Sequence, residues 1–263
     1  MDKITVIKVG GQVVENPETL AELLDGFAAI EGKKVLVHGG GKSATKIATQ
    51  LGIETKMVDG RRITDAEMLK VVTMVYGGLV NKNVVAQLQS RGINALGLTG
   101  ADMNVMKSHK RTGTTIDYGF VGDVDKADGK MLSTLIEAGV VPIMAPLTHD
   151  GNGQLLNTNA DTIAAETAKA LTPYYNVTLI YCFEKKGVLS NPDDDDSVIS
   201  QISRADFDRM VNDGSVNSGM IPKLQNSFQS LEAGVKEVII CDYHIKGGTL
   251  ISNCNENPEV RNV

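Results

Sequence analysis

The sequence has no apolar run that approaches the roughly 20 residues a membrane-spanning helix needs. It enters a strand-like run at Ile4–Val9, which leaves no room for a signal peptide before it. Cysteine is scarce, and Cys182, Cys241 and Cys254 lie far apart without the spacing of a metal site or a disulfide framework. We therefore expect reduced thiols and a cytoplasmic protein that makes no membrane contact.

Positive charge and histidine are also sparse. The formal net charge is −6 and no Lys/Arg run offsets it, which speaks against a nucleic-acid partner. His109, His149 and His244 share no ligand spacing, and His38 ends an apolar run, where we interpret it as a core or capping residue. The sequence therefore predicts no protein-held metal site.

Strand-like and helix-like segments alternate along the 263 residues, 42% of which are hydrophobic. Asn16-Pro17 is typical of a capped helix start, and Thr64 with Glu67 forms a capping-box pattern before a long helix. The principal expected strands are 4–9, 35–38, 93–98, 140–145, 177–183 and 238–241. This alternation predicts an α/β fold, with a mostly parallel sheet covered by helices on both faces.

Two glycine turns follow the first two expected strands. Lys8-Val9-Gly10-Gly11 ends the first, and Gly39-Gly40-Gly41 lies between the second strand and a helix. Glycine lets backbone N–H groups approach a phosphate, and a helix that starts after a strand forms an anion site. Each turn alone is equally compatible with an ordinary chain reversal.

Two polar motifs begin helices in the second half of the chain. Asn157-Thr158-Asn159-Ala160-Asp161 follows an apolar strand, as a ligand-orienting segment or an ordinary N-cap would. Gly219-Met220-Ile221-Pro222-Lys223 places a lysine on the first turns of another helix. By itself, that lysine is most simply a solvated side chain.

Known nucleotide motifs fit only in part. A Walker A loop ending at Gly41-Lys42-Ser43 needs a glycine where Leu36 stands, so we reject it. Gly39, Gly41 and Ala44, with Asp59 about 20 residues on, satisfy the dinucleotide fingerprint. An NAD-dependent dehydrogenase is therefore an open alternative, although it leaves the other polar motifs unused.

Taken together, the motifs resemble those of the N-acetylglutamate kinases, in the amino acid kinase superfamily. Five occur in the family's order between Ile4 and about Ile251: Lys8-x-Gly10-Gly11, His38-Gly39-Gly40-Gly41, Asp59-Gly60-Arg61-Arg62-Ile63-Thr64, the Asn157–Asp161 segment, and Gly219-Met220-x-x-Lys223. The resemblance implies a three-layer αβα sandwich. It also implies an arginine-biosynthesis enzyme that uses ATP to phosphorylate the side-chain carboxylate of an N-acyl-L-glutamate.

The resemblance also implies residue roles. Lys8 and Lys223 would stabilise the transferring phosphoryl group, and Asp161 would organise both lysines. The residues expected to bind the acylglutamate are Gly40, Gly41, Arg62, Asn157 and Asn159. Those expected at ATP are Gly10, Gly11, Lys186, Gly187, Gly219 and Met220, with backbone N–H groups of Gly10, Gly11, Gly40 and Gly41 donating to phosphates or substrate. Mg²⁺ would be held mainly by phosphates and water.

At the level of the whole chain, the resemblance implies one amino acid kinase domain over residues 1–263. Residues 1 to about 172 would bind the acylglutamate, and about 173–263 the nucleotide. A homodimer would form through the Thr64–Arg91 region. Because the first strand starts by Ile4, we expect no N-terminal helical extension, and hence no arginine-inhibited hexamer.

Two departures from the family pattern leave specificity open. Phe183-Glu184-Lys185-Lys186 replaces a Ser-Asp-Val-type segment, so the base and ribose contacts of ATP are not fixed. Arg61 stands where relatives carry an apolar residue, and Lys56 is on the same segment. Either cation would suit a succinyl carboxylate, although Arg61 facing water, with an acetyl substrate, is the simpler interpretation.

Sibling functions are the remaining alternatives. A kinase for aspartate, free glutamate, carbamate or a nucleoside monophosphate would share the scaffold, as would a non-catalytic amino-acid sensor. The presence of Lys8, Lys223 and Asp161 speaks against the sensor.

Overall fold

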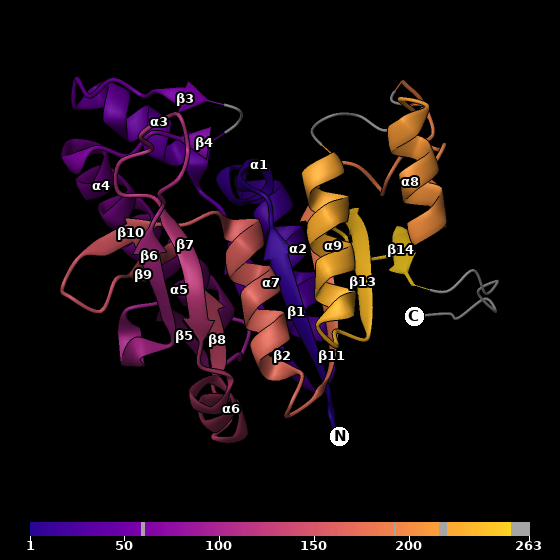
Figure 1. Ribbon diagram of the computed structural model, residues 1–263. Helices are drawn as coiled ribbons and strands as arrows, with labels where there is room; N and C mark the ends of the chain where they lie inside the picture. Colours follow the sequence, from indigo (N-terminus) through magenta and orange to yellow (C-terminus); the bar gives the residue numbers. More distant parts are fainter. Residues whose placement is uncertain (59–60, 192, 216–219, 254–263) are drawn as a thin grey trace.

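A computed structural model describes residues 1–58, 61–191, 193–215 and 220–253 (Figure 1). Its main sheet has eight strands in the order β12-β14-β13-β11-β1-β2-β8-β5. The six strands from β13 to β5 are mutually parallel, and β14 pairs antiparallel with β13 at one edge. The bounds are β1 Lys3–Val9, β2 Lys33–His38, β5 Ala95–Leu98, β8 Val141–Met144, β11 Asn176–Phe183, β12 Gln201–Ser203, β13 Glu237–Asp242 and β14 Thr249–Ser252.

Helices cover both faces of this sheet, which confirms the predicted three-layer architecture (Figure 1). One face carries α1 Gly11–Glu15, α2 Pro17–Ala29, α3 Gly41–Gln50, α4 Ala66–Val72, the π-helical η1 Thr73–Val80 and α5 Asn81–Gln89. The other carries α6 Gly129–Glu137, α7 Ala160–Leu171, α8 Arg204–Asn212 and α9 Ile221–Glu232. Along β1, Ile4 and Val6 pack on the α7 side, whereas Ile7 and Val9 pack on the α2 side. By this alternation Lys8 belongs to the α7 side.

Two smaller β excursions project from the main sheet. Strands β3 Met57–Val58 and β4 Arg61–Arg62 pair antiparallel, which confirms the expected hairpin, while Asp59-Gly60 lies outside the described residues. A four-stranded sheet β10-β9-β6-β7 forms from β6 Met106–Lys110, β7 Gly122–Ala127, β9 Leu147–His149 and β10 Leu155–Asn157, after the 3₁₀ turn η2 Asp102–Asn104. Thr64 joins the two excursions: its N–H donates to Tyr118 O at 2.9 Å, and its carbonyl accepts from Phe120 N at 2.6 Å.

Of the two capping patterns expected in the first half of the chain, one is confirmed. Asn16 caps α2 by accepting from Glu18 N and Thr19 N, as expected. The capping box expected at Thr64 is wrong, because Asp65 caps α4 by accepting from Met68 N at 2.8 Å. Thr64 is instead held by its bonds to the β6–β7 excursion.

The structure describes two of the three cysteines. Cys182 and Cys241 are buried free thiols on neighbouring strands, with their Sγ atoms 3.8 Å apart, and Cys254 lies outside the described residues. Among the helices that the structure describes, none has both the length and the apolar character required to cross a bilayer.

Candidate active site

The two glycine turns meet at the carboxyl ends of β1 and β2. A Cβ atom on Gly39 would lie 3.0 Å from Gly11 N, and one on Gly11 would lie 3.5 Å from Gly40 N. Gly40 has a φ of 156°, and a Cβ there would approach the Tyr76 ring to 3.1 Å. Glycine is therefore required at Gly39 by the neighbouring backbone and at Gly40 by its φ and the Tyr76 ring. The turns lie at the edge of the sheet where α/β folds bind ligands.

Some N–H groups of these turns are available to a ligand and others are not. Gly11 and Gly41 are the first residues of α1 and α3, so their N–H groups have no intrahelical acceptor. Gly10 N instead donates to Cys182 O at 3.0 Å. The expectation that the Gly10 N–H binds phosphate is therefore wrong, because β-type pairing with β11 already uses this donor.

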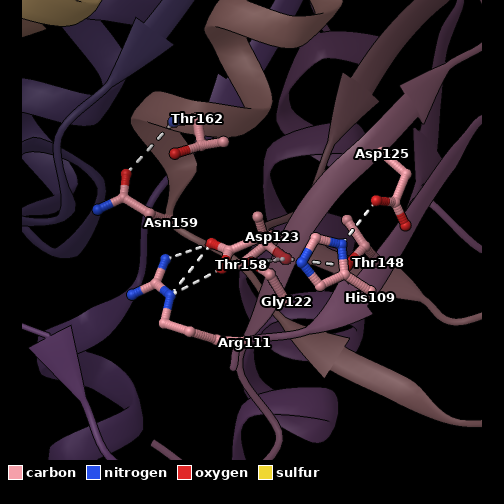
Figure 2. Close-up of polar contacts among 9 residues, drawn as sticks. All are labelled: His109, Arg111, Gly122, Asp123, Asp125, Thr148, Thr158, Asn159 and Thr162. Atoms are coloured by element: carbon pink, nitrogen blue, oxygen red, sulfur yellow. Dashed lines mark hydrogen bonds and ion pairs between the residues drawn. The ribbon is translucent and has the colours of Figure 1, made fainter. Parts of the chain in front are cut away.

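Lys8 and Asp161 form an ion pair at the centre of the molecule. Lys8 Nζ lies 2.8 Å from Asp161 Oδ1, and the Lys8 side chain is 9% exposed. Asp161 is in the first turn of α7, where Asn159 caps the helix by accepting from Asp161 N at 2.7 Å and from Thr162 N (Figure 2). The Asn159 cap therefore fixes the turn that presents Asp161 to the end of β1.

Phe183 connects the two lysines, a contact that sequence reasoning missed. Its ring centre is 4.9 Å from Lys8 Nζ and 3.4 Å from Lys223 Nζ, both within cation–π range. Burial lowers the pKa of Lys223; nearby Asp161 opposes this shift and Lys8 reinforces it. Residues from opposite ends of the chain thus place two ammonium groups at one ring, and Asp161 pairs with one of them.

A cavity of about 200 Å³ opens beside this cluster. The five residues expected to bind the acylglutamate all line it: Gly40, Gly41, Arg62, Asn157 and Asn159. Tyr76, Arg61 and Arg111 also line it. The structure thus brings together residues from the glycine turn after β2, the β3–β4 hairpin, the β6–β7 excursion and the start of α7.

Arg62 is fixed inside the cavity wall. It is 8% exposed, and its Nη2 donates to Gly41 O at 2.7 Å and to Thr45 Oγ1 at 2.9 Å. Asn157 Nδ2 donates to Thr64 Oγ1 at 2.9 Å. Protein contacts therefore hold Arg62 and Asn157 in place at the cavity wall.

Arg111 is a cavity residue that no sequence motif indicated. Its Nε donates to Asp123 Oδ2 at 3.0 Å, and its Nη2 donates to Asp123 Oδ1 (Figure 2). This hydrogen-bonded pair holds the pKa of Asp123 below its ordinary value, and the charge of Arg61 adds a smaller effect in the same direction. The β6–β7 pairing creates this arrangement, so residue spacing alone carried no signal for it.

The residues expected at the nucleotide are more dispersed. Met220 is the N-cap of α9, one turn before Lys223, and Gly219 lies outside the described residues. Lys186 forms an exposed ion pair with Asp196 at 2.5 Å. Gly187 packs on β14, where a Cβ would lie 2.7 Å from Thr249 Oγ1. Within the part of the chain that the structure describes, no recorded contact joins Lys186 or Gly187 to the Lys8–Asp161 pair.

Comparison with known proteins gives consistent matches over nearly the whole chain. The model of the amino acid kinase family matches residues 3–242. The acetylglutamate kinase of Bacteroides thetaiotaomicron is 70% identical over 239 residues, covering 91% of this chain and 93% of that protein. The acetylglutamate kinase of Bacteroides fragilis is 67% identical over 253 residues, covering 95% and 97%. A crystal structure from Streptococcus mutans has a TM-score of 0.80 at 29% identity, covering 95% and 99%.

Proposed function

The chain belongs to the amino acid kinase family, and we propose that it has acetylglutamate kinase activity in arginine biosynthesis. The enzyme transfers the γ-phosphoryl group of ATP to the side-chain carboxylate of N-acetyl-L-glutamate. The single observation that supports this most is the Lys8–Asp161 ion pair beside Lys223, next to a cavity lined by arginine and asparagine. A dehydrogenase or a sibling kinase is not favoured, because relatives at 67–70% identity are acetylglutamate kinases.

The reaction needs alignment and charge neutralisation rather than a general base. A glutamate side chain has a reference pKa of about 4.3 and is already ionised at neutral pH. One of its oxygens attacks the γ-phosphorus, forming a P–O bond while the bond to the ADP oxygen breaks. We assign Lys8 and Lys223 to the phosphoryl oxygens, because their positive charges stabilise the negative charge of the transition state.

Asp161 acts on Lys8 directly and on Lys223 through its charge. Its ion pair with Lys8 fixes the position of that ammonium group, and its charge favours protonated Lys223 against the effect of burial. Without Asp161, the two like charges at the Phe183 ring would repel each other. We therefore assign Asp161 the role of holding Lys8 in place and of favouring protonated Lys223.

The acylglutamate is assigned to the cavity. Arg62 and Asn157 hold its α-carboxylate, with Asn159 at the same wall, because these side chains are already fixed at the cavity surface. The N–H groups of Gly40 and Gly41 face the reacting end of the substrate, where an anion at the start of α3 is favoured. Residues 1 to about 172 then form the acylglutamate lobe.

ATP is assigned to the lobe formed by residues 173–263, with its phosphates directed to Lys223 and to the Gly11 N–H. We assign magnesium to phosphate oxygens and water, where it would supply positive charge to the nucleotide phosphates. Lys186, Gly187, Gly219 and Met220 stay expectations for the nucleotide.

A cytoplasmic homodimer completes the proposal. Met74 and Leu79, in the Thr64–Arg91 region proposed as the interface, are 54% and 50% exposed. Large exposed apolar side chains of this kind are typical of a contact surface. Light scattering at micromolar concentration would show a dimer, whereas a monomer would contradict the assignment.

The activity is tested by measuring ADP release with a panel of acceptors: N-acetyl-L-glutamate, free L-glutamate, L-aspartate and carbamate. We expect N-acetyl-L-glutamate to be used with a far higher specificity constant than the other three. A preference for any of those three would reassign the enzyme within its family. No release with any acceptor would refute the kinase.

A further inference from the structure

The cavity contains more positive charge than an acetylglutamate can use. Its lining includes three guanidinium groups, Arg61, Arg62 and Arg111, and no carboxylate among the described residues. Asp123, outside the lining, neutralises Arg111. In the proposed function the substrate's γ-carboxylate faces the lysines and its α-carboxylate uses Arg62. N-acetyl-L-glutamate then has no further carboxylate for Arg61 to bind.

One nitrogen of the Arg111 guanidinium group has no hydrogen-bond acceptor among the described residues. Asp123 occupies its Nε and Nη2 atoms, and Figure 2 shows the remaining nitrogen turned away from Asp123. This nitrogen, Nη1, is buried and has no hydrogen-bond acceptor among the described residues. A buried donor without an acceptor is costly, so a bound acceptor group would remove a cost that the free protein carries.

Arg61 and Arg111 lie at the same part of the cavity although they come from different excursions. Both line it, and the charge of Arg61 contributes to the lowered pKa of Asp123, the partner of Arg111. The backbone bonds between Thr64 and the Tyr118–Phe120 segment tie the β3–β4 hairpin to the β6–β7 excursion. Arg61 and Arg111 therefore line one cavity from two excursions that are tied together.

We propose that Arg61 and Arg111 form a second carboxylate subsite, which recognises an N-acyl-L-glutamate whose acyl group itself ends in a carboxylate, such as N-succinyl-L-glutamate. The inference rests on the proposed function and extends it to the acyl group. An arginine can hold a carboxylate through two parallel N–H···O bonds. Charge-assisted bonds of this kind would favour the charged acyl group over a neutral one by roughly tenfold to a hundredfold.

The test compares specificity constants for three substrates that share the glutamate part. N-acetyl-L-glutamate is short and neutral at the acyl end, N-butyryl-L-glutamate is longer and neutral, and N-succinyl-L-glutamate is longer and charged. We expect succinyl to exceed both others by at least tenfold. If butyryl matches succinyl, the cavity recognises length rather than charge, and the subsite is refuted. If acetyl exceeds succinyl, the subsite is refuted while the proposed activity stands.

Variants then assign the effect to residues. Arg111→Gln and Arg61→Gln should each lower the succinyl-to-butyryl ratio of specificity constants at least fivefold. Lys110→Gln and Lys56→Gln are matched controls, because these lysines lie on the same two excursions without lining the cavity, and their ratios should stay at the parent value. If Arg111 binds the α-carboxylate instead, all substrates will weaken together and the ratio will not change, which overturns the proposal. Failure to phosphorylate any acylglutamate would refute the proposed function as well.

Discussion

His38 should make the protein lose stability when the pH falls from 7 to 5. The ring is fully buried, with Nδ1 at 2.8 Å from Gly39 O and Nε2 at 3.0 Å from Asn81 Nδ2. Asn81 Nδ2 also donates to Ile143 O at 2.9 Å. The arrangement suits a neutral ring that donates from Nδ1 and accepts at Nε2. Burial lowers the pKa of His38 from 6.5 to about 4.

The size of the effect follows from proton linkage. Between pH 6.5 and 4 the unfolded chain binds a proton at His38 that the folded protein does not bind. The stabilisation by neutral His38 is therefore complete above this range and is lost as the pH falls through it. The loss is about 2 kcal/mol between pH 7 and pH 5, and about 3 kcal/mol at pH 4.

The assay is urea unfolding followed by circular dichroism at pH 7, 6 and 5. The parent protein should lose about 2 kcal/mol more over this range than His38→Gln, whose side chain cannot titrate. His109→Gln is the comparison variant, because it removes an exposed histidine and leaves the buried ring of His38 intact. Equal pH dependence in the parent and in His38→Gln would refute the assignment of a buried neutral ring.

Three further outcomes are expected at the site. Lys8→Met and Lys223→Met should each lower kcat by on the order of 10²–10³, as removal of a preorganised charge does; steady-state kinetics that show only a raised KM would contradict this. Because burial lowers the pKa of Lys223, kcat should fall as the pH rises through a value below 10.5. The residual activity of Lys223→Arg should not show this decrease at high pH. Gly40→Ala places a Cβ 3.1 Å from the Tyr76 ring at a φ of 156° and should cost roughly 1–3 kcal/mol of stability, together with most activity, whereas Gly78→Ala, with open space around it, should lower neither.

Much of the main sheet could be predicted from the sequence because its strands are buried on both faces. Runs such as Ile4–Val9 and Val177–Phe183 are almost continuously apolar, which is typical of parallel strands between two helical layers. The short strands Leu147–His149 and Leu155–Asn157 gave no comparable signal, since they pair with each other and β9 also pairs with the distant β6. The π-helical Thr73–Val80 was also missed, because its pattern is compatible with an ordinary helix.

Some residues of the candidate site could likewise be predicted from the sequence, and others could not. Lys8, Lys223, Asp161 and the five residues expected at the acylglutamate belong to the motifs that carry the family resemblance, so their roles could be proposed before their positions were known. Phe183 was noticed only as a departure from the family pattern. Its role depends on two lysines that reach it from opposite ends of the chain.

Backbone pairing and hairpin geometry account for what remained. The sequence predicted that the N–H of Gly10 binds phosphate, but in the structure this N–H donates to Cys182 O of the neighbouring strand β11. Arg111 lies in an irregular segment whose sequence carries no motif, and its place in the cavity comes from the pairing of β6 with β7. Such features depend on tertiary contacts, which residue spacing along the chain does not encode.

The central claim is that a substrate carboxylate becomes an acyl phosphate. It is tested most directly by trapping the product with hydroxylamine, which converts an acyl phosphate to a hydroxamate, while ADP is measured in the same sample. With N-acetyl-L-glutamate and ATP we expect one equivalent of hydroxamate for each equivalent of ADP. Release of ADP without hydroxamate would show that the phosphoryl group goes elsewhere, and would refute phosphorylation of the carboxylate.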